Sequence, residues 1–71
     1  SKVITKIEIN LINEPTKLYV GVINKYNVKA QYELQKEEKL YYYSFAEYLN
    51  AKHIYIESKE LATIEKIIIY Y

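Results

Sequence analysis

The chain has 71 residues, about half of them hydrophobic, with ten lysines, nine glutamates and a formal net charge of +1. This length allows one small domain, which buries only about 60% of the surface that its unfolded chain exposes. The absence of cysteine excludes disulfides and thiolate metal sites, and the near-zero net charge argues against a dedicated nucleic-acid binder.

The first half of the chain predicts strands joined by short turns. Apolar and polar residues alternate over 2–12, 18–23 and 28–35, which is the period of a half-buried strand. Pro15 marks the turn at 13–16, and asparagines mark a hairpin turn at 24–27. With a fourth strand at 40–43, these segments predict an antiparallel meander.

A short helix is predicted at 44–52, directly after the fourth strand. Ser44 and Glu47 have the spacing of a capping box, and Tyr43 and Tyr48 have the spacing of a hydrophobic staple. Phe45, with Tyr48 and the following leucine, would then cover one face of a sheet.

Two further segments complete the predicted fold. Residues 53–57 form a short strand, and residues 63–71 favour a strand because successive isoleucines lose rotamer freedom in a helix, although a helical stripe is also present there. The predicted class is α+β: an antiparallel sheet of five to six strands, built from a meander of four, the helix at 44–52 and a C-terminal strand pair. The helix packs on one face of this sheet, in a single domain over 1–71.

The sequence offers no catalytic, metal-binding or cofactor-binding pattern. His53 is the only histidine, and on a strand it would lie about 13 Å from Glu57, too far for pairing. A single glycine, Gly21, excludes glycine-rich phosphate loops. We therefore predict that the chain is not an enzyme and carries no cofactor.

Tyrosine is the feature that suggests a function, because it combines a large apolar body with a polar tip and is enriched at contact surfaces. Strand alternation places Tyr41 and Tyr43 on one face and Tyr42 on the other. Alternatively, tyrosine simply replaces other aromatic residues throughout the core. The predicted partner-binding residues are Tyr19, Tyr26, Tyr41, Tyr42, Tyr43, Tyr55 and Tyr70.

These observations predict a protein-binding module that acts through a tyrosine-rich sheet face or an open strand edge. The alternative is a protein that binds single-stranded nucleic acid, which would require Lys25, Lys29, Lys39 and Lys52 to gather on the tyrosine face while glutamates collect elsewhere.

Three further expectations concern the setting of the protein. An uncovered sheet face predicts a homodimer. No apolar run approaches the length of a membrane span, so we expect a cytoplasmic protein without a membrane partner. Size and composition also suggest the hypothesis of a viral or mobile-element accessory protein that blocks a host protein.

Overall fold

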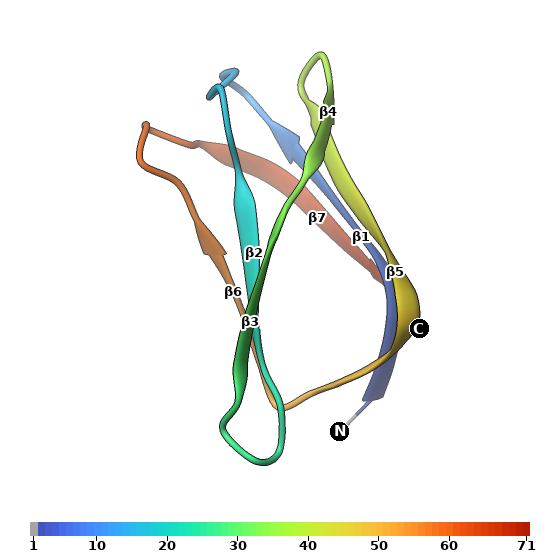
Figure 1. Cartoon of the computed structure of the whole chain (residues 1–71). Helices are drawn as coiled ribbons and strands as arrows, with labels where there is room; N and C mark the ends of the chain where they lie inside the picture. The colour runs from blue at the N-terminus through green and yellow to red at the C-terminus, as the bar shows by residue number, and fades with distance from the viewer. Residues whose placement is uncertain (1) are drawn as a thin grey trace.

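The computed structural model describes residues 2–71, apart from the side chains of residue 2 and residues 46–50. The described residues form seven strands and no helix. In chain order the strands are β1 (Lys2–Leu11), β2 (Tyr19–Ile23), β3 (Lys29–Glu33), β4 (Gln35–Glu37), β5 (Leu40–Ala51), β6 (His53–Glu57) and β7 (Ile64–Tyr70). They make two antiparallel sheets, one in the order β4-β5-β1-β7 and one in the order β3-β2-β6 (Figure 1).

The predicted helix at 44–52 is wrong, because β5 continues as a strand from Leu40 to Ala51. Its second half pairs with the start of β1, with Leu49 opposite Ile4. A two-turn helix is marginal by itself, whereas this segment is rich in aromatic residues that favour strands and finds a ready partner in β1. The predicted contacts of the Glu47 and Tyr48 side chains lie outside the described side chains.

The α+β class is also wrong, because the layer that faces the four-stranded sheet is a second sheet. Two long runs of chain bend from one sheet into the other: β3 leads into β4 at Leu34, and β5 leads into β6 at Lys52. The Leu34 N–H donates to the Leu18 carbonyl at 2.8 Å, and the Lys52 N–H donates to the Ile23 carbonyl at 2.8 Å. These bends allow the sheets to cover each other without a helix.

The predicted meander and C-terminal strand pair are wrong as well. β1 pairs with β5 and β7 and not with β2, while β6 pairs with β2. Three local predictions are confirmed: the β2–β3 hairpin exists, the short strand at 53–57 is β6, and the favoured strand at 63–71 is β7. In the hairpin turn Asn27 adopts a φ of 62°, and the Asn24 side chain accepts hydrogen bonds from the N–H groups of Tyr26 and Val28.

The core lies between the two sheets. The predicted alternation in β1 is confirmed from Lys6 to Leu11, since Ile7, Ile9 and Leu11 are buried while Lys6 and Glu8 lie on the opposite face. It is wrong at the start of the strand, where Ile4 is buried and Val3 is exposed, because the register shifts between Ile4 and Lys6. The buried cluster consists of Ile7, Ile9, Leu11, Leu18, Val20, Leu34 and Tyr41. Within the described residues, no helix has the length and apolar character needed to cross a membrane.

Candidate functional site

Tyr41 belongs to the core and is not available to a partner. It is fully buried in β5, and its hydroxyl donates a 2.5 Å hydrogen bond to the carbonyl of Pro15, which is also buried. This bond satisfies the polar tip of the ring inside the protein, as buried tyrosines generally require.

Tyr43 also faces inward, and Tyr42 lies on the other side of β5, as strand alternation predicted. Tyr43 packs with Tyr32 and Phe45 in an aromatic cluster whose ring centroids are 5.1 to 5.3 Å apart. This cluster packs against the buried core. The alternative interpretation of tyrosine as a core residue is therefore right for Tyr41 and Tyr43.

Tyr19 and Tyr55 lie on the outer face of the β3-β2-β6 sheet and are half-buried. The Tyr55 ring lies over Gly21, and the Gln31 side chain donates a hydrogen bond to Glu57 across the same face. The Tyr55 ring therefore packs against its own sheet.

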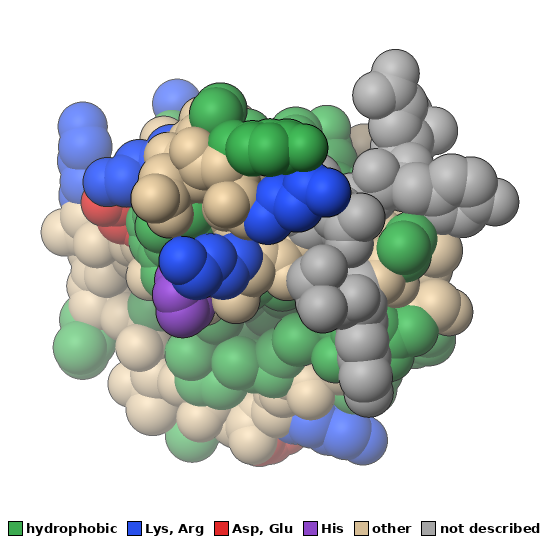
Figure 2. All heavy atoms as spheres, turned by 90° about the horizontal axis from the view of Figure 1, so that it is seen from below, with side chains coloured by type: hydrophobic (Ala, Val, Ile, Leu, Met, Phe, Trp, Pro, Cys, Tyr) green, Lys and Arg blue, Asp and Glu red, His purple; other side chains and the backbone are tan. Residues whose placement is uncertain are grey.

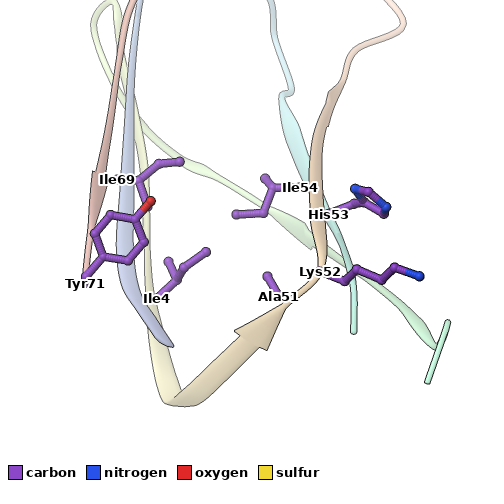
Figure 3. Close-up of a pocket in the computed structure, with 7 residues that line it drawn as sticks. All are labelled: Ile4, Ala51, Lys52, His53, Ile54, Ile69 and Tyr71. Carbon is purple, nitrogen blue, oxygen red and sulfur yellow. The ribbon is translucent and has the colours of Figure 1, made fainter. Parts of the chain in front are cut away.

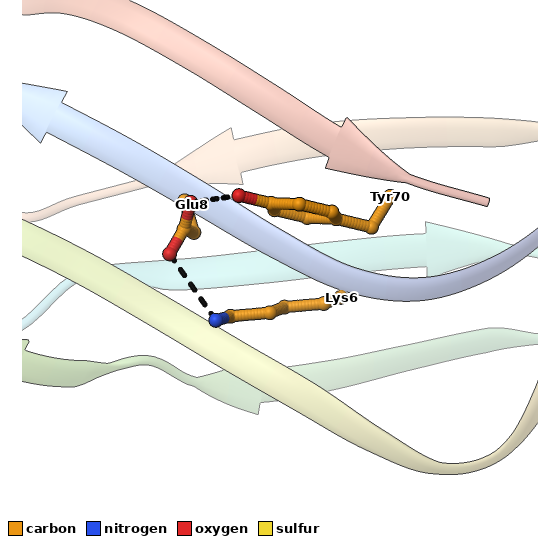
Figure 4. A network of polar contacts seen from close by, with 3 residues as sticks. All are labelled: Lys6, Glu8 and Tyr70. Atoms are coloured by element: carbon orange, nitrogen blue, oxygen red, sulfur yellow. Dashed lines mark hydrogen bonds and ion pairs between the residues drawn. The ribbon is translucent and has the colours of Figure 1, made fainter.

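Tyr42 and Tyr70 lie on the outer face of the four-stranded sheet. There Tyr70 forms a small polar network with Lys6 and Glu8 of β1 (Figure 4). Glu8 accepts a 2.5 Å hydrogen bond from the Tyr70 hydroxyl and lies 3.2 Å from the Lys6 ammonium group. The Lys6 ammonium also lies 5.8 Å from the Tyr42 ring centroid and 5.4 Å from that of Tyr70. Lys6 therefore contacts two aromatic rings as well as the carboxylate.

This network shifts two pKa values in opposite directions. The hydrogen bond from Tyr70 lowers the pKa of Glu8, and the neighbouring Lys6 lowers it further. The same hydrogen bond raises the pKa of Tyr70 because losing the phenolic proton would place two negative charges together. At neutral pH the pair therefore holds an ionised carboxylate and a protonated hydroxyl.

The outer edge of β7 is a largely apolar strand edge that the sequence analysis did not identify. β7 is last in its sheet, so one side of the strand has no neighbouring strand among the described residues. Ile67 is 43% exposed and Tyr70 is 39% exposed, although both lie within the strand. The sequence did carry a sign of this edge. A half-buried strand needs an apolar residue only at every second position, whereas Ile67, Ile68 and Ile69 are apolar at three consecutive positions.

Positive charge gathers at one end of the β3-β2-β6 sheet. Ile23 pairs with Lys29 on one side and with His53 on the other, and its carbonyl accepts from the Lys52 N–H. Figure 2, a view of this end, shows the histidine with lysine side chains beside it. Glu33 and Glu57 lie at the opposite end of the sheet, where both pair with Tyr19.

Tyr26 adds an exposed aromatic ring next to this positive end. It lies in the β2–β3 turn with 73% of its surface exposed, and the Lys25 ammonium is 5.1 Å from its ring centroid. Of the four lysines that the nucleic-acid alternative required, Lys39 is the exception, since it lies in the turn between β4 and β5 at the other end of the molecule (Figure 1).

A hollow of about 270 Å³ opens between β6 and the end of β7, and both apolar and polar residues line it. Ile4, Ile54 and Ile69 point into it, whereas the side chains of Lys52 and His53 point away (Figure 3). His53 is exposed at the first position of β6. The described residues contain no group of three or more histidine, cysteine, aspartate or glutamate side chains that could hold a metal ion.

Comparison with protein-family models, with curated proteins and with solved structures finds no match for this chain.

Proposed function

We propose that the chain is a non-enzymatic protein-binding module that accepts a β-strand along the outer edge of β7. The observation that supports this proposal most directly is that a seven-residue strand ends its sheet without a further neighbour among the described residues. An edge strand presents unpaired N–H and C=O groups, and these can pair with an extended segment of another protein.

The side chains of β7 do little to discourage such pairing. Soluble proteins commonly protect their edges with short strands, charged residues or proline. β4, at the other edge of the same sheet, has three residues, all polar and exposed. β7 is longer, and it carries charge only at Glu65 and Lys66, so isoleucines and Tyr70 fill the rest of its edge.

Tyr70 gives a bound strand further surface to contact at this edge, whereas Tyr42 lies two strands away on β5. Tyr70 ends β7, and Tyr42 lies on the same outer face with Lys6 between the two rings. Backbone pairing would supply affinity, while Tyr70 and the half-buried Ile68 on the outer face would supply side-chain specificity. Of the predicted tyrosines, Tyr70 supports this function best.

The proposal is tested by selecting binders from a random peptide library displayed on phage, with the purified protein as bait. Peptides that bind the wild type should bind Ile68→Lys at least tenfold more weakly, because the new charge protects the edge. Val28→Lys is the matched control, since Val28 is an exposed apolar residue in the β2–β3 turn region. On binding, backbone amides of β7 should become protected from hydrogen exchange. Selected peptides that bind Ile68→Lys as tightly as the wild type would contradict strand addition at this edge.

A second candidate function is binding of single-stranded nucleic acid at the positive end of the β3-β2-β6 sheet. Lys25, Lys29 and Lys52 gather there with the exposed ring of Tyr26, and bases stack readily on such rings. A titration with a labelled oligonucleotide distinguishes the candidates. Affinity for the oligonucleotide should fall steeply with salt and be lost in Tyr26→Ala, whereas peptide binding at β7 should hardly respond to salt.

A further inference from the structure

We propose that the strand best suited to the β7 edge is β7 of a second copy, paired antiparallel about a two-fold axis that passes through Ile68. This inference rests on the proposed function, because it requires that the edge accepts a strand. It goes further by naming the partner and the register of pairing.

The regular part of β7 places the axis. β7 pairs with β1 without interruption from Lys66 to Tyr70, and the register shifts between Lys66 and Ile64. Such an irregularity disrupts the ladder locally, so the regular edge has five residues with Ile68 in the middle. In an antiparallel pair, residues directly opposite each other either both exchange hydrogen bonds or both do not, and these two kinds of position alternate along the strand. A two-fold axis between two identical strands must therefore place one residue opposite its own copy, and cannot fall between two residues.

The side chains favour Ile68 over Ile67 and Lys66 as the axis. With the axis at Ile68, Ile68 faces its own copy and Ile67 faces Ile69, so aliphatic side chains meet aliphatic side chains. With the axis at Ile67, Glu65 would face Ile69 and Lys66 would face Ile68. With the axis at Lys66, two ammonium groups would face each other, which is destabilising.

The same register is complementary in charge. Lys66 of each copy faces Tyr70 of the other, and the Tyr70 hydroxyl donates to the ionised Glu8. A lysine opposite an aromatic ring that is bonded to a carboxylate gains both a cation–π contact and a nearby negative charge. Lys66 of the same chain also lowers the pKa of Glu8 by its charge, although the Tyr70 hydrogen bond and Lys6 lower it more.

Pairing would cover the apolar edge and join the two four-stranded sheets into one sheet of eight. The order would be β4-β5-β1-β7 followed by β7-β1-β5-β4 of the second copy. The exposed parts of Ile67 and Tyr70 would be buried between the copies. The open edge that invites nonspecific strand pairing would then be removed.

The absence of cysteine from the chain makes a disulfide test direct. In Ile68→Cys the two introduced thiols face each other across neighbouring strands, at a separation that a disulfide can span. Under mild oxidation this variant should form a covalent dimer at least tenfold faster than Val28→Cys, which measures random collision. Ile67→Cys should react no faster than Val28→Cys, because position 67 faces position 69. Equal rates for Ile68→Cys and Val28→Cys, or faster reaction of Ile67→Cys, would overturn the proposed axis.

Sedimentation equilibrium supplies a measurement without a new thiol. The wild type should sediment at about 17 kDa, twice the 8.5 kDa chain, and Ile68→Lys should sediment as a monomer with an unchanged circular dichroism spectrum. A monomeric wild type would overturn self-pairing. If the wild type is monomeric but selected peptides still bind the β7 edge, the proposal of strand addition holds and only the dimer is refuted. If the wild type is monomeric and no peptide binds the edge, both proposals are refuted.

Discussion

The ring of Tyr55 lies over Gly21 and occupies the space that a Cβ atom at position 21 would need. The two residues face each other across β2 and β6, so the ring covers the strand at its one glycine. Gly21→Ala should therefore displace Tyr55 and lower the free energy of unfolding by about 1–3 kcal/mol, the usual cost of overpacking. Urea denaturation measures this change.

A double-mutant cycle provides the control for this prediction. In a Tyr55→Ala background the space over position 21 is open, and alanine is intrinsically better than glycine within a strand. Gly21→Ala should then be neutral or stabilising by up to about 1 kcal/mol. An equal loss of stability in both backgrounds would show that the ring is not the cause.

Tyr41→Phe tests the buried hydrogen bond between the Tyr41 hydroxyl and the Pro15 carbonyl. Removing the hydroxyl leaves a buried acceptor without this partner, so the variant should lose about 1–3 kcal/mol of unfolding free energy. Tyr43→Phe is the matched control in the same strand, because the Tyr43 hydroxyl makes no hydrogen bond among the described side chains. That control should change stability by less than about 0.5 kcal/mol. Similar losses in both variants would contradict a specific role for the Pro15 bond.

Local patterns predicted the strands of this fold better than they predicted its topology. The alternation over 6–11, the hairpin turn at 24–27 and the strand at the end of the chain are confirmed, since each depends on nearby residues. The helix at 44–52 failed because the Ser44 cap pattern is a local preference, whereas pairing of this segment with β1 depends on residues about forty positions away.

The same distinction applies to the candidate binding surfaces. Alternation correctly separated Tyr42 from Tyr41 and Tyr43, yet it could not say which side faces the core. β7 lies at a sheet edge because of the order of the strands in the sheet. This order could not be predicted, because pairing between strands that are distant in sequence leaves little trace in composition. The run Ile67 to Ile69 was the one local sign of an unusual edge.

Glu38→Gly should stabilise the turn between β4 and β5. Glu38 adopts a φ of 56°, a left-handed conformation that costs a residue with a Cβ atom roughly 1–2 kcal/mol and glycine almost nothing. Glycine also makes the unfolded chain more flexible, which offsets part of this benefit. We therefore expect the free energy of unfolding to rise by about 0.5–1 kcal/mol, as measured by thermal or urea denaturation. Lys39→Gly, next to it in the same turn, has no left-handed backbone to relieve and should give no gain.

Tyr70→Phe should raise the pKa of Glu8 toward its ordinary value, because the Tyr70 hydrogen bond is the main cause of its lowering. An NMR titration of ¹³C-labelled glutamate side chains measures this shift directly. Tyr42→Phe, on the same sheet face, should leave the Glu8 titration almost unchanged. Equal behaviour of the two variants would show that the hydroxyl of Tyr70 does not hold the carboxylate.

The stability difference between the wild type and Tyr70→Phe should depend on pH with a maximum near neutrality. The lowered pKa of Glu8 stabilises the folded state above the ordinary glutamate value, and this contribution is lost as pH falls through the folded pKa. The raised pKa of Tyr70 stabilises the folded state below the ordinary tyrosine value, and this contribution is lost as pH rises through the folded pKa. Urea denaturation of both proteins at acidic, neutral and alkaline pH checks the expectation, and a difference that stays constant from neutral to acidic pH would contradict it.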